Sequence, residues 1–326
     1  MTNFFKNKTI LITGGTGSFG KEATKFFLKK TNLKKLIIFS RDELKQYEMR
    51  KKIKSNKIRF FIGDVRDKQR LLIATKDVDY IIHAAALKQV DTAEYNPTEF
   101  IDTNIIGAKN IIETCSVNKI KKVIALSTDK ACSPINLYGA TKLCSDKLFI
   151  AANNYIPDTT FSIIRYGNVE GSSGSVIPFF KSLKNNFSIP ITSTSMTRFS
   201  LSLKQSVYLA DWSLLNSLGG EIIVPKIPSY RILDLAKSIN PKAKINIIGV
   251  RPGEKIYEEL ISNHDYNNTY ELKKFYVVLP FGLKKLINYY KNRHQAKKVK
   301  TNFAYRSDTN KNYLNTKQLK KIIKNL

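Results

Sequence analysis

Two residues in the middle of the chain have the types and the spacing that proton transfer requires. Tyr138 and Lys142 are four positions apart, so a helix would place the phenol and the ammonium on one face, one turn from each other. A free tyrosine has a pKa of about 10 and is a poor base at neutral pH. A neighbouring ammonium favours the phenolate, and lowering the pKa by about three units takes roughly 4 kcal/mol. Such a pair can take the proton of a sugar hydroxyl while a nicotinamide takes the hydride.

A glycine motif near the start of the chain is typical of dinucleotide binding. Gly14, Gly17 and Gly20 follow an apolar, strand-like run and open a helix-compatible stretch. Glycine permits the tight turn and lets the backbone approach a pyrophosphate, to which the helix start offers free N–H groups. An ordinary glycine-rich turn is the alternative. Thr16, Ser18 and Phe19 belong to the same motif, so we expect them near the cofactor as well.

The residues after the second expected strand bear on the choice of cofactor. Ser40 and Arg41, with Lys45 one turn later, suit a 2′-phosphate and therefore favour NADP. Asp42 and Glu43 keep NAD open, because an acidic residue here would bind a ribose 2′-hydroxyl, although both also suit a helix start. Further residues expected at the cofactor, from later strand ends, are Asp64, Val65, Ala84 and Val169.

The elements that must position these residues alternate regularly through the first half of the chain. Strands separated by helices predict an α/β fold, a Rossmann-type doubly wound parallel sheet covered on both faces. The expected strands are Thr9–Thr13, Leu36–Phe39, Ile58–Ile62, Tyr80–His83, Val123–Leu126 and Phe161–Arg165. The expected helices are Gly17–Lys30, Asp42–Ile53, Lys68–Ala74, Pro97–Val117 and Leu137–Asn154.

The alternation is lost after about Gly171, where prolines punctuate shorter elements. We therefore expect a Rossmann domain over 1–170 and a smaller substrate-binding α/β lobe with a basic tail over 171–326. A helix near 204–218 is expected to pack back onto the sheet.

Composition places the chain among soluble proteins. It has 326 residues, of which 42% are hydrophobic and 25% charged, and no apolar run approaches the roughly 20 residues that cross a bilayer. The N-terminus shows no signal-peptide pattern. The three cysteines lack metal-type spacing and the three histidines are scattered, so we expect a cytoplasmic protein without disulfides or a metal site.

The formal net charge of +29 raises the question of a polyanionic partner. The lysines extend from Lys6 to Lys324 and are densest after Lys284, and no nucleic-acid-binding motif accompanies them. We expect a lysine-rich surface, no specific nucleic-acid partner, and a field that attracts an anionic substrate.

These motifs together resemble the extended short-chain dehydrogenase/reductase superfamily. Within it, the chain is similar to the inverting UDP-N-acetylglucosamine 4,6-dehydratases that begin pseudaminic acid synthesis. The resemblance runs from about Lys8 to Glu259. Its segments are His83–Val90, Glu94–Pro97, Thr103-Asn104, Ser127–Lys130, Asn136–Lys142, Arg165–Val169, Met196–Phe199 and Arg251–Lys255.

The resemblance implies a role for the dipeptide Asp129-Lys130. Related dehydratases of dTDP- or GDP-hexoses carry Asp-Glu there, and 4-epimerases need neither residue. Lys130 is implied as the base for the C5 proton and Asp129 as the acid for the C6 hydroxyl, so the pKa of the lysine must fall and that of the aspartate must rise. The implied catalytic set is Thr128, Asp129, Lys130, Tyr138 and Lys142.

The implied reaction is a lyase reaction without net oxidation. The C4 hydride is held on NADP and returned to C6, and C5 is reprotonated from the opposite face. The product would be UDP-2-acetamido-2,6-dideoxy-β-L-arabino-hex-4-ulose, for flagellin glycosylation, a capsule or lipopolysaccharide. The family also implies a homo-oligomer, and UDP-N-acetylglucosamine held by Lys88, Asn168, Arg198, Arg251 and Glu254.

The chain departs from the family pattern at Asp91-Thr92, Cys132, Glu170 and Tyr257. Glu170 and Tyr257 could alter substrate preference, and oxidation of Cys132 could inhibit the enzyme through Lys130.

Other functions stay open at this point. They are a UDP-sugar 4-epimerase, a retaining 4,6-dehydratase, and a nicotinamide-sensing or polyanion-binding protein on a degenerate dehydrogenase fold. Members of the last kind usually lose the tyrosine or the lysine, and this chain keeps both.

Overall fold

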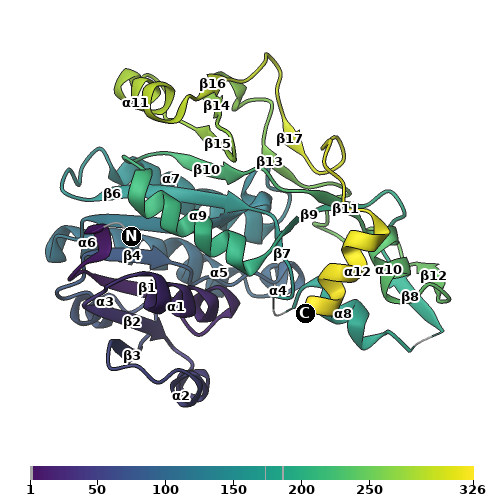
Figure 1. Ribbon diagram of the computed structural model, residues 1–326, viewed down its shortest axis with the longest axis horizontal. Coiled ribbons are helices and arrows are strands. Elements are labelled where there is room, and N and C mark those ends of the chain that lie inside the picture. Colours follow the sequence, from purple (N-terminus) through teal and green to yellow (C-terminus); the bar gives the residue numbers. More distant parts are fainter. Residues whose placement is uncertain (1–2, 173, 186) are drawn as a thin grey trace.

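The centre of the molecule is a twisted sheet of mostly parallel strands with helices on both faces (Figure 1). The computed structural model describes residues 3–172, 174–185 and 187–326, and among these residues the sheet has ten strands in the order β16-β14-β15-β10-β6-β5-β4-β1-β2-β3. The six strands of the first half pair in parallel. They are β1 (Thr9–Thr13), β2 (Lys35–Ser40), β3 (Ile58–Ile62), β4 (Tyr80–His83), β5 (Lys122–Thr128) and β6 (Thr160–Tyr166). The Rossmann-type α/β fold is confirmed.

The strands form where continuous apolar runs can be buried on both faces. Every residue of β1 and of β4 is buried. Side-chain caps begin several of the intervening helices: Asp42 caps α2 and Asn136 caps α7. The helices of this half are α1 (Ser18–Lys30), α2 (Glu43–Lys52), α3 (Lys68–Ala74), α4 (Val90–Tyr95), α5 (Pro97–Ile101), α6 (Gly107–Asn118) and α7 (Leu137–Ala152).

The helix expected over Pro97–Val117 is instead interrupted. A π-helical turn, Asp102–Ile106, separates α5 from α6. This turn lets Asn104 reach sideways: its amide donates to the carbonyl oxygen of Leu87 and to the hydroxyl of Thr141, and its oxygen accepts from the Leu87 N–H. The irregular turn thus ties the loop after β4 to helix α7, which carries Tyr138.

Part of the C-terminal half extends the central sheet. β10 (Ile222–Pro225) pairs in parallel with β6, and β15 (Phe275–Val278), β14 (Thr269–Glu271) and β16 (Lys297–Lys298) continue antiparallel beyond it. Helix α9 (Leu203–Asn216) buries Val207, Leu209, Ala210 and Leu214 in the same core. The division predicted at residue 170 therefore does not coincide with the edge of the sheet.

The rest of the C-terminal half forms a smaller body beside the carboxyl ends of the strands (Figure 1). Its own core joins α8 (Val176–Ser182), α10 (Ile232–Ile239) and α12 (Thr316–Asn325) with the paired strands β8 (Ser188–Ile191) and β12 (Lys244–Ile247). The tail after Lys284 is structured and contains α11 (Lys284–His294) as well as α12. The connecting strands are β7 (Asn168–Val169), β9 (Thr197–Leu201), β11 (Ser229–Arg231), β13 (Glu259–Ile261) and β17 (Tyr305–Arg306). No helix among the described residues is long and apolar enough to cross a bilayer.

Candidate active site

A cleft of about 1240 Å³ runs along the carboxyl ends of the parallel strands, between the sheet and the smaller body. Open α/β sheets bind their ligands at this edge. All the predicted site residues except Gly20 line the cleft. They are Gly14, Thr16, Gly17, Ser18, Phe19, Ser40, Arg41, Lys45, Asp64, Val65, Ala84, Lys88, Thr128, Asp129, Lys130, Tyr138, Lys142, Asn168, Val169, Arg198, Arg251 and Glu254.

The glycine loop shapes one end of the cleft. Gly14 has φ +63°, and a Cβ there would lie 2.9 Å from the backbone of Ala84. Gly20 supports the loop from behind, because a Cβ at this position would press on the Gly15 carbonyl. Gly17 precedes α1 and has no side chain to cap the first N–H groups of that helix. The loop is thus shaped to bring backbone donors close to an anionic ligand.

A chain of buried polar contacts fixes the strand ends beneath this loop. The hydroxyl of Thr13 accepts from the N–H groups of Ala84 and Ala85 and pairs with Nδ1 of His83 at 2.9 Å. Burial, assisted by the charge of Lys142, lowers the pKa of His83 to about 3, so its imidazole is neutral.

The charged residues after β2 already have partners: Asp42 pairs with Lys45, and Arg41 pairs with Asp64. Asp42 accepts from the backbone N–H of Lys45, and the Lys45 ammonium also pairs with its carboxylate. Arg41 Nη1 lies 3.7 Å from Oδ2 of Asp64, and the Arg41 side chain is half exposed. The Ser40 hydroxyl is buried and pairs with that of Thr16 at 2.7 Å.

Tyr138 and Lys142 are both buried in the first turns of α7. Burial raises the pKa of Tyr138 to about 12, against the opposing effects of the Lys130 charge and of a hydrogen bond with Thr128. Burial also lowers the pKa of Lys142, although the carboxylate of Asp146 opposes it. The pKa of Tyr138 is therefore not lowered as expected, and the charge that most favours its phenolate is that of Lys130.

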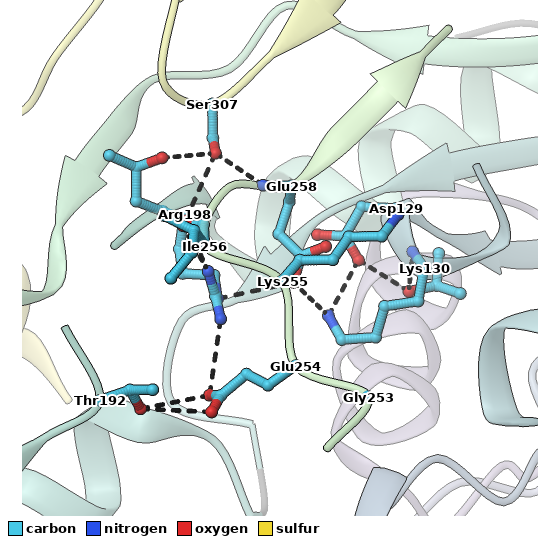
Figure 2. Close-up of polar contacts among 12 residues, drawn as sticks. Asp129, Lys130, Thr192, Arg198, Gly253, Glu254, Lys255, Ile256, Glu258 and Ser307 are labelled. Atoms are coloured by element: carbon cyan, nitrogen blue, oxygen red, sulfur yellow. Dashed lines mark hydrogen bonds and ion pairs between the residues drawn. The ribbon is translucent and has the colours of Figure 1, made fainter. Parts of the chain in front are cut away.

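Asp129 and Lys130 form a short 3-10 turn, Asp129–Ala131, directly after β5. Lys130 Nζ lies 3.2 Å from Asp129 Oδ1 and 3.0 Å from Glu258 Oε1 (Figure 2). Burial and the charge of Glu258 raise the pKa of Asp129, as expected for a proton donor. The expected fall in the pKa of Lys130 is wrong: burial alone would lower it, but Asp129 and Glu258 outweigh burial and raise it.

Two arginines approach this centre from the smaller body. Arg198, on β9, lies 3.5 Å from Glu258 through Nε and 3.7 Å from Glu254 through Nη2 (Figure 2). Arg251 contacts Glu254 and Asp91, each at 3.2 Å, and its side chain is 55% exposed. Glu254 therefore lies between two guanidinium groups that face the cleft.

The other two residues predicted to bind substrate, Lys88 after β4 and Asn168 on β7, also line the cleft. Burial and the charge of Lys130 lower the pKa of Lys88. Among the described residues, Oδ1 of Asn168 is buried without a hydrogen-bond partner. Such an atom on the wall of a cleft suits a polar ligand.

The residues that depart from the family pattern serve local contacts. Glu170 accepts from the Ser200 hydroxyl at 2.6 Å, and the ring of Tyr257 lies under the Arg306 guanidinium. Cys132 is buried, and burial raises the pKa of its thiol to about 12. Because the thiolate is the reactive form, this argues against the expected inhibition by oxidation.

Two features of the site were not predicted from the sequence. Glu258 contacts Lys130 across 128 positions of chain, and the buried ion pair of Arg165 with Asp146 lies beneath Ser127. Arg165 stands in a segment that carries the family resemblance, but neither its spacing nor that of Glu258 points to a partner.

Fold and site together place the chain in the short-chain dehydrogenase/reductase class, with a doubly wound sheet, a glycine-rich first turn and a Tyr-x-x-x-Lys pair at the carboxyl edge. The chain belongs to the polysaccharide biosynthesis protein family, whose family model matches residues 10–280.

Individual relatives cover nearly the whole chain. The inverting UDP-N-acetylglucosamine 4,6-dehydratase of Campylobacter jejuni subsp. jejuni serotype O:23/36 (strain 81-176) is 51% identical over 98% of this chain and 98% of that protein. The UDP-glucose 4-epimerase of Rickettsia bellii (strain OSU 85-389) is 44% identical over 99% of this chain and 97% of that protein. The X-ray structure of Pen from Bacillus thuringiensis superposes with a TM-score of 0.90 at 37% identity, covering 99% of this chain and 98% of that one. The resemblance to the inverting dehydratases is thus confirmed.

Proposed function

We propose that this chain is a lyase that removes water across C5 and C6 of UDP-N-acetylglucosamine and inverts C5. The observation that carries the proposal is the Asp129-Lys130 pair in the cleft, with Nζ of the lysine 3.2 Å from Oδ1 of the aspartate. Elimination needs a base that acts on one carbon and an acid that acts on its neighbour. A lysine and an aspartate can fill these roles, and here they lie within hydrogen-bond distance of each other. The 51% identity to an inverting dehydratase supports the same assignment.

The glycine loop fits a nicotinamide dinucleotide. A Cβ at Gly14 would collide with Ala84, and the uncapped start of α1 faces the same space. When bound, a nicotinamide would supply an acceptor for the C4 hydride and a donor for C6.

We infer NADP as the form that binds. The carboxylate of Asp42 is occupied as a helix cap and as the partner of Lys45, which leaves it poorly placed for a ribose 2′-hydroxyl. Arg41 is half exposed beside it, and a guanidinium binds phosphate through two parallel hydrogen bonds.

The chain's own residues then divide the proton transfers. Tyr138 takes the C4 hydroxyl proton; the charge of Lys130 favours its phenolate, and Lys142 lies one turn away on the same helix. Lys130 takes the C5 proton and Asp129 protonates the departing C6 hydroxyl. Tyr138 returns its proton to C5 from the opposite face. Arg198 and Arg251 hold the diphosphate, and Lys88, Asn168 and Glu254 contact the substrate.

The family resemblance supports the wider setting of this proposal. The product would be UDP-2-acetamido-2,6-dideoxy-β-L-arabino-hex-4-ulose, an intermediate of pseudaminic acid synthesis, made by a homo-oligomeric cytoplasmic enzyme.

Proton NMR of a reaction run in deuterium oxide tests the proposal. UDP-N-acetylglucosamine should give a 6-deoxy methyl group, a deuterium at C5 and the inverted C5 configuration. A product without the methyl group, or with unchanged C5, would contradict it.

A UDP-sugar 4-epimerase is the second candidate, because the UDP-glucose 4-epimerase of Rickettsia bellii is 44% identical over nearly the whole chain. Lys130→Ala separates the two. An epimerase keeps interconverting 4-epimers in this variant, whereas a dehydratase loses the elimination.

A further inference from the structure

Glu258 is a buried carboxylate that the reaction as described so far does not use. Its side chain is 1% exposed, and its Oε1 lies 3.0 Å from Lys130 Nζ. Figure 2 shows Glu258 and Lys130 pointing toward one another from opposite sides of the site. An isolated buried carboxylate is costly, so its position beside the elimination pair requires an explanation.

The backbone around Glu258 is held firmly. Its N–H donates to the Ser307 hydroxyl at 2.9 Å, and the Ser307 N–H donates to its carbonyl oxygen at 2.8 Å. Arg198 Nε lies 3.5 Å from the same Oε1 that meets Lys130. Burial alone would raise the pKa of Glu258, but the charges of Lys130 and Arg198 outweigh it and lower the pKa, so the carboxylate stays ionised.

We infer that Glu258 is a positioning residue of the elimination site, whose charge holds the Lys130 ammonium beside Asp129 so that these two side chains share one proton. The inference rests on the proposed dehydratase function and adds to it the origin of the acid and the base. Lys130 is held from both sides, by Asp129 Oδ1 at 3.2 Å and by Glu258 Oε1 at 3.0 Å.

Because Lys130 and Asp129 share one proton, a single proton transfer produces both the base and the acid that elimination needs. An N–H bond of the Lys130 ammonium breaks and an O–H bond forms on Asp129, which gives a neutral amine and a protonated carboxyl. The amine then takes the C5 proton, and the carboxyl gives its proton to the C6 hydroxyl, which leaves as water. The pair ends as ammonium and carboxylate again, so the elimination needs no proton from solvent.

Asp129 has an oxygen suited to this role. Among the described residues, its Oδ2 is buried without a hydrogen-bond partner, and so is Oε2 of Glu258, so each carboxylate has an oxygen open to a proton. A Cβ on Gly167 would lie 3.1 Å from that oxygen, so the glycine leaves space beside it. Glu258 is the poorer acceptor, because Arg198 stabilises its ionised form.

The charge of Glu258 acts on both members of the pair in the same direction. It raises the pKa of Lys130 by stabilising the ammonium, and it raises the pKa of Asp129 by repelling the carboxylate. The other charged or titratable groups facing this centre are Arg198, Lys255, Glu254, Tyr138, Tyr230 and Lys88. Removing the negative charge must therefore lower both pKa values.

The test is the pH profile of kcat for Glu258→Gln with UDP-N-acetylglucosamine. We expect both limbs to move to lower pH by about one unit or more, and kcat to fall about tenfold or more. Glu258→Asp keeps the negative charge but places it farther from Nζ, so the limbs of its pH profile should move less. This variant provides the test if Glu258→Gln does not fold. Glu259→Gln is the matched control, because Glu259 pairs with Ser133 instead and its limbs should stay in place. Limbs that do not move in either Glu258 variant overturn the inference.

Competitive acetylation of Lys130, followed by mass spectrometry, gives a measurement independent of turnover. In Glu258→Gln the amine should become reactive at lower pH than in the unaltered protein. An unchanged reactivity profile counts against the inference alone. Failure of the unaltered protein to dehydrate UDP-N-acetylglucosamine counts against the proposed function instead, and the acetylation result still decides the role of Glu258.

Discussion

Replacing Arg165 by methionine should cost about 3–5 kcal/mol of unfolding free energy, because it leaves a buried charge without its partner. Arg165 Nη2 lies 3.2 Å from Asp146 Oδ2, and the two side chains are 4% and 2% exposed. Methionine keeps much of the apolar stem of arginine, so the loss should come mainly from the charge. The Ser127 hydroxyl, which donates to the same oxygen at 2.7 Å, compensates only in part.

Urea unfolding followed by the fluorescence of the single tryptophan, Trp212, measures this loss. Trp212 is on α9 and packs against Phe275 of β15, so its signal reports on the sheet. The double variant Arg165→Met, Asp146→Leu removes both charges and should be more stable than Arg165→Met alone. A loss below about 1 kcal/mol in Arg165→Met, or a double variant no more stable than the single one, would refute this reasoning.

Three further predictions concern the cleft, the glycine loop and helix α9. Arg41→Ala should weaken NADP binding about tenfold or more and leave NAD binding nearly unchanged, as measured by calorimetric titration of each dinucleotide; an equal loss for both would contradict a 2′-phosphate contact. Gly20→Ala should cost about 1–3 kcal/mol and weaken dinucleotide binding, because its Cβ meets the Gly15 carbonyl; equilibrium unfolding and the same titration check both effects. Burial raises the pKa of Asp211 to about 6. Its contribution to stability is therefore present below its unfolded pKa and is lost as pH rises through about 6. Asp211→Asn should be more stable than the unaltered protein at about pH 8 but not at about pH 4, and equal denaturation midpoints at about pH 8 would contradict the shift.

The first half of the chain could be predicted well because its signals are local. The apolar runs of β1 and β4 were placed at their true bounds, Thr9–Thr13 and Tyr80–His83, since continuous apolar residues between turns identify buried parallel strands. The cleft was predictable for the same reason: parallel strands bring their carboxyl ends, and the polar residues that follow, to one edge.

The remaining features depend on contacts between distant segments. The fall in the pKa of Lys130 was expected from desolvation or nearby cations, but the charges of Asp129 and Glu258 outweigh burial. Glu258 comes from a distant segment, next to the pairing of β13 with β17. The π-helical turn at Asp102–Ile106 likewise depends on what Asn104 meets, and no spacing in the sequence reveals that.

The position of β10 has a consequence for how this protein can be divided. β6 pairs with β10 through Ile163 and Ile164, and α9 covers the same part of the core. A fragment ending near residue 170 would present β6 as a long apolar edge with unsatisfied backbone donors and acceptors, the kind of surface that templates aggregation. The N-terminal half is therefore not a portable module: it depends on segments synthesised after it, and grafting or expressing it alone would require a substitute for them.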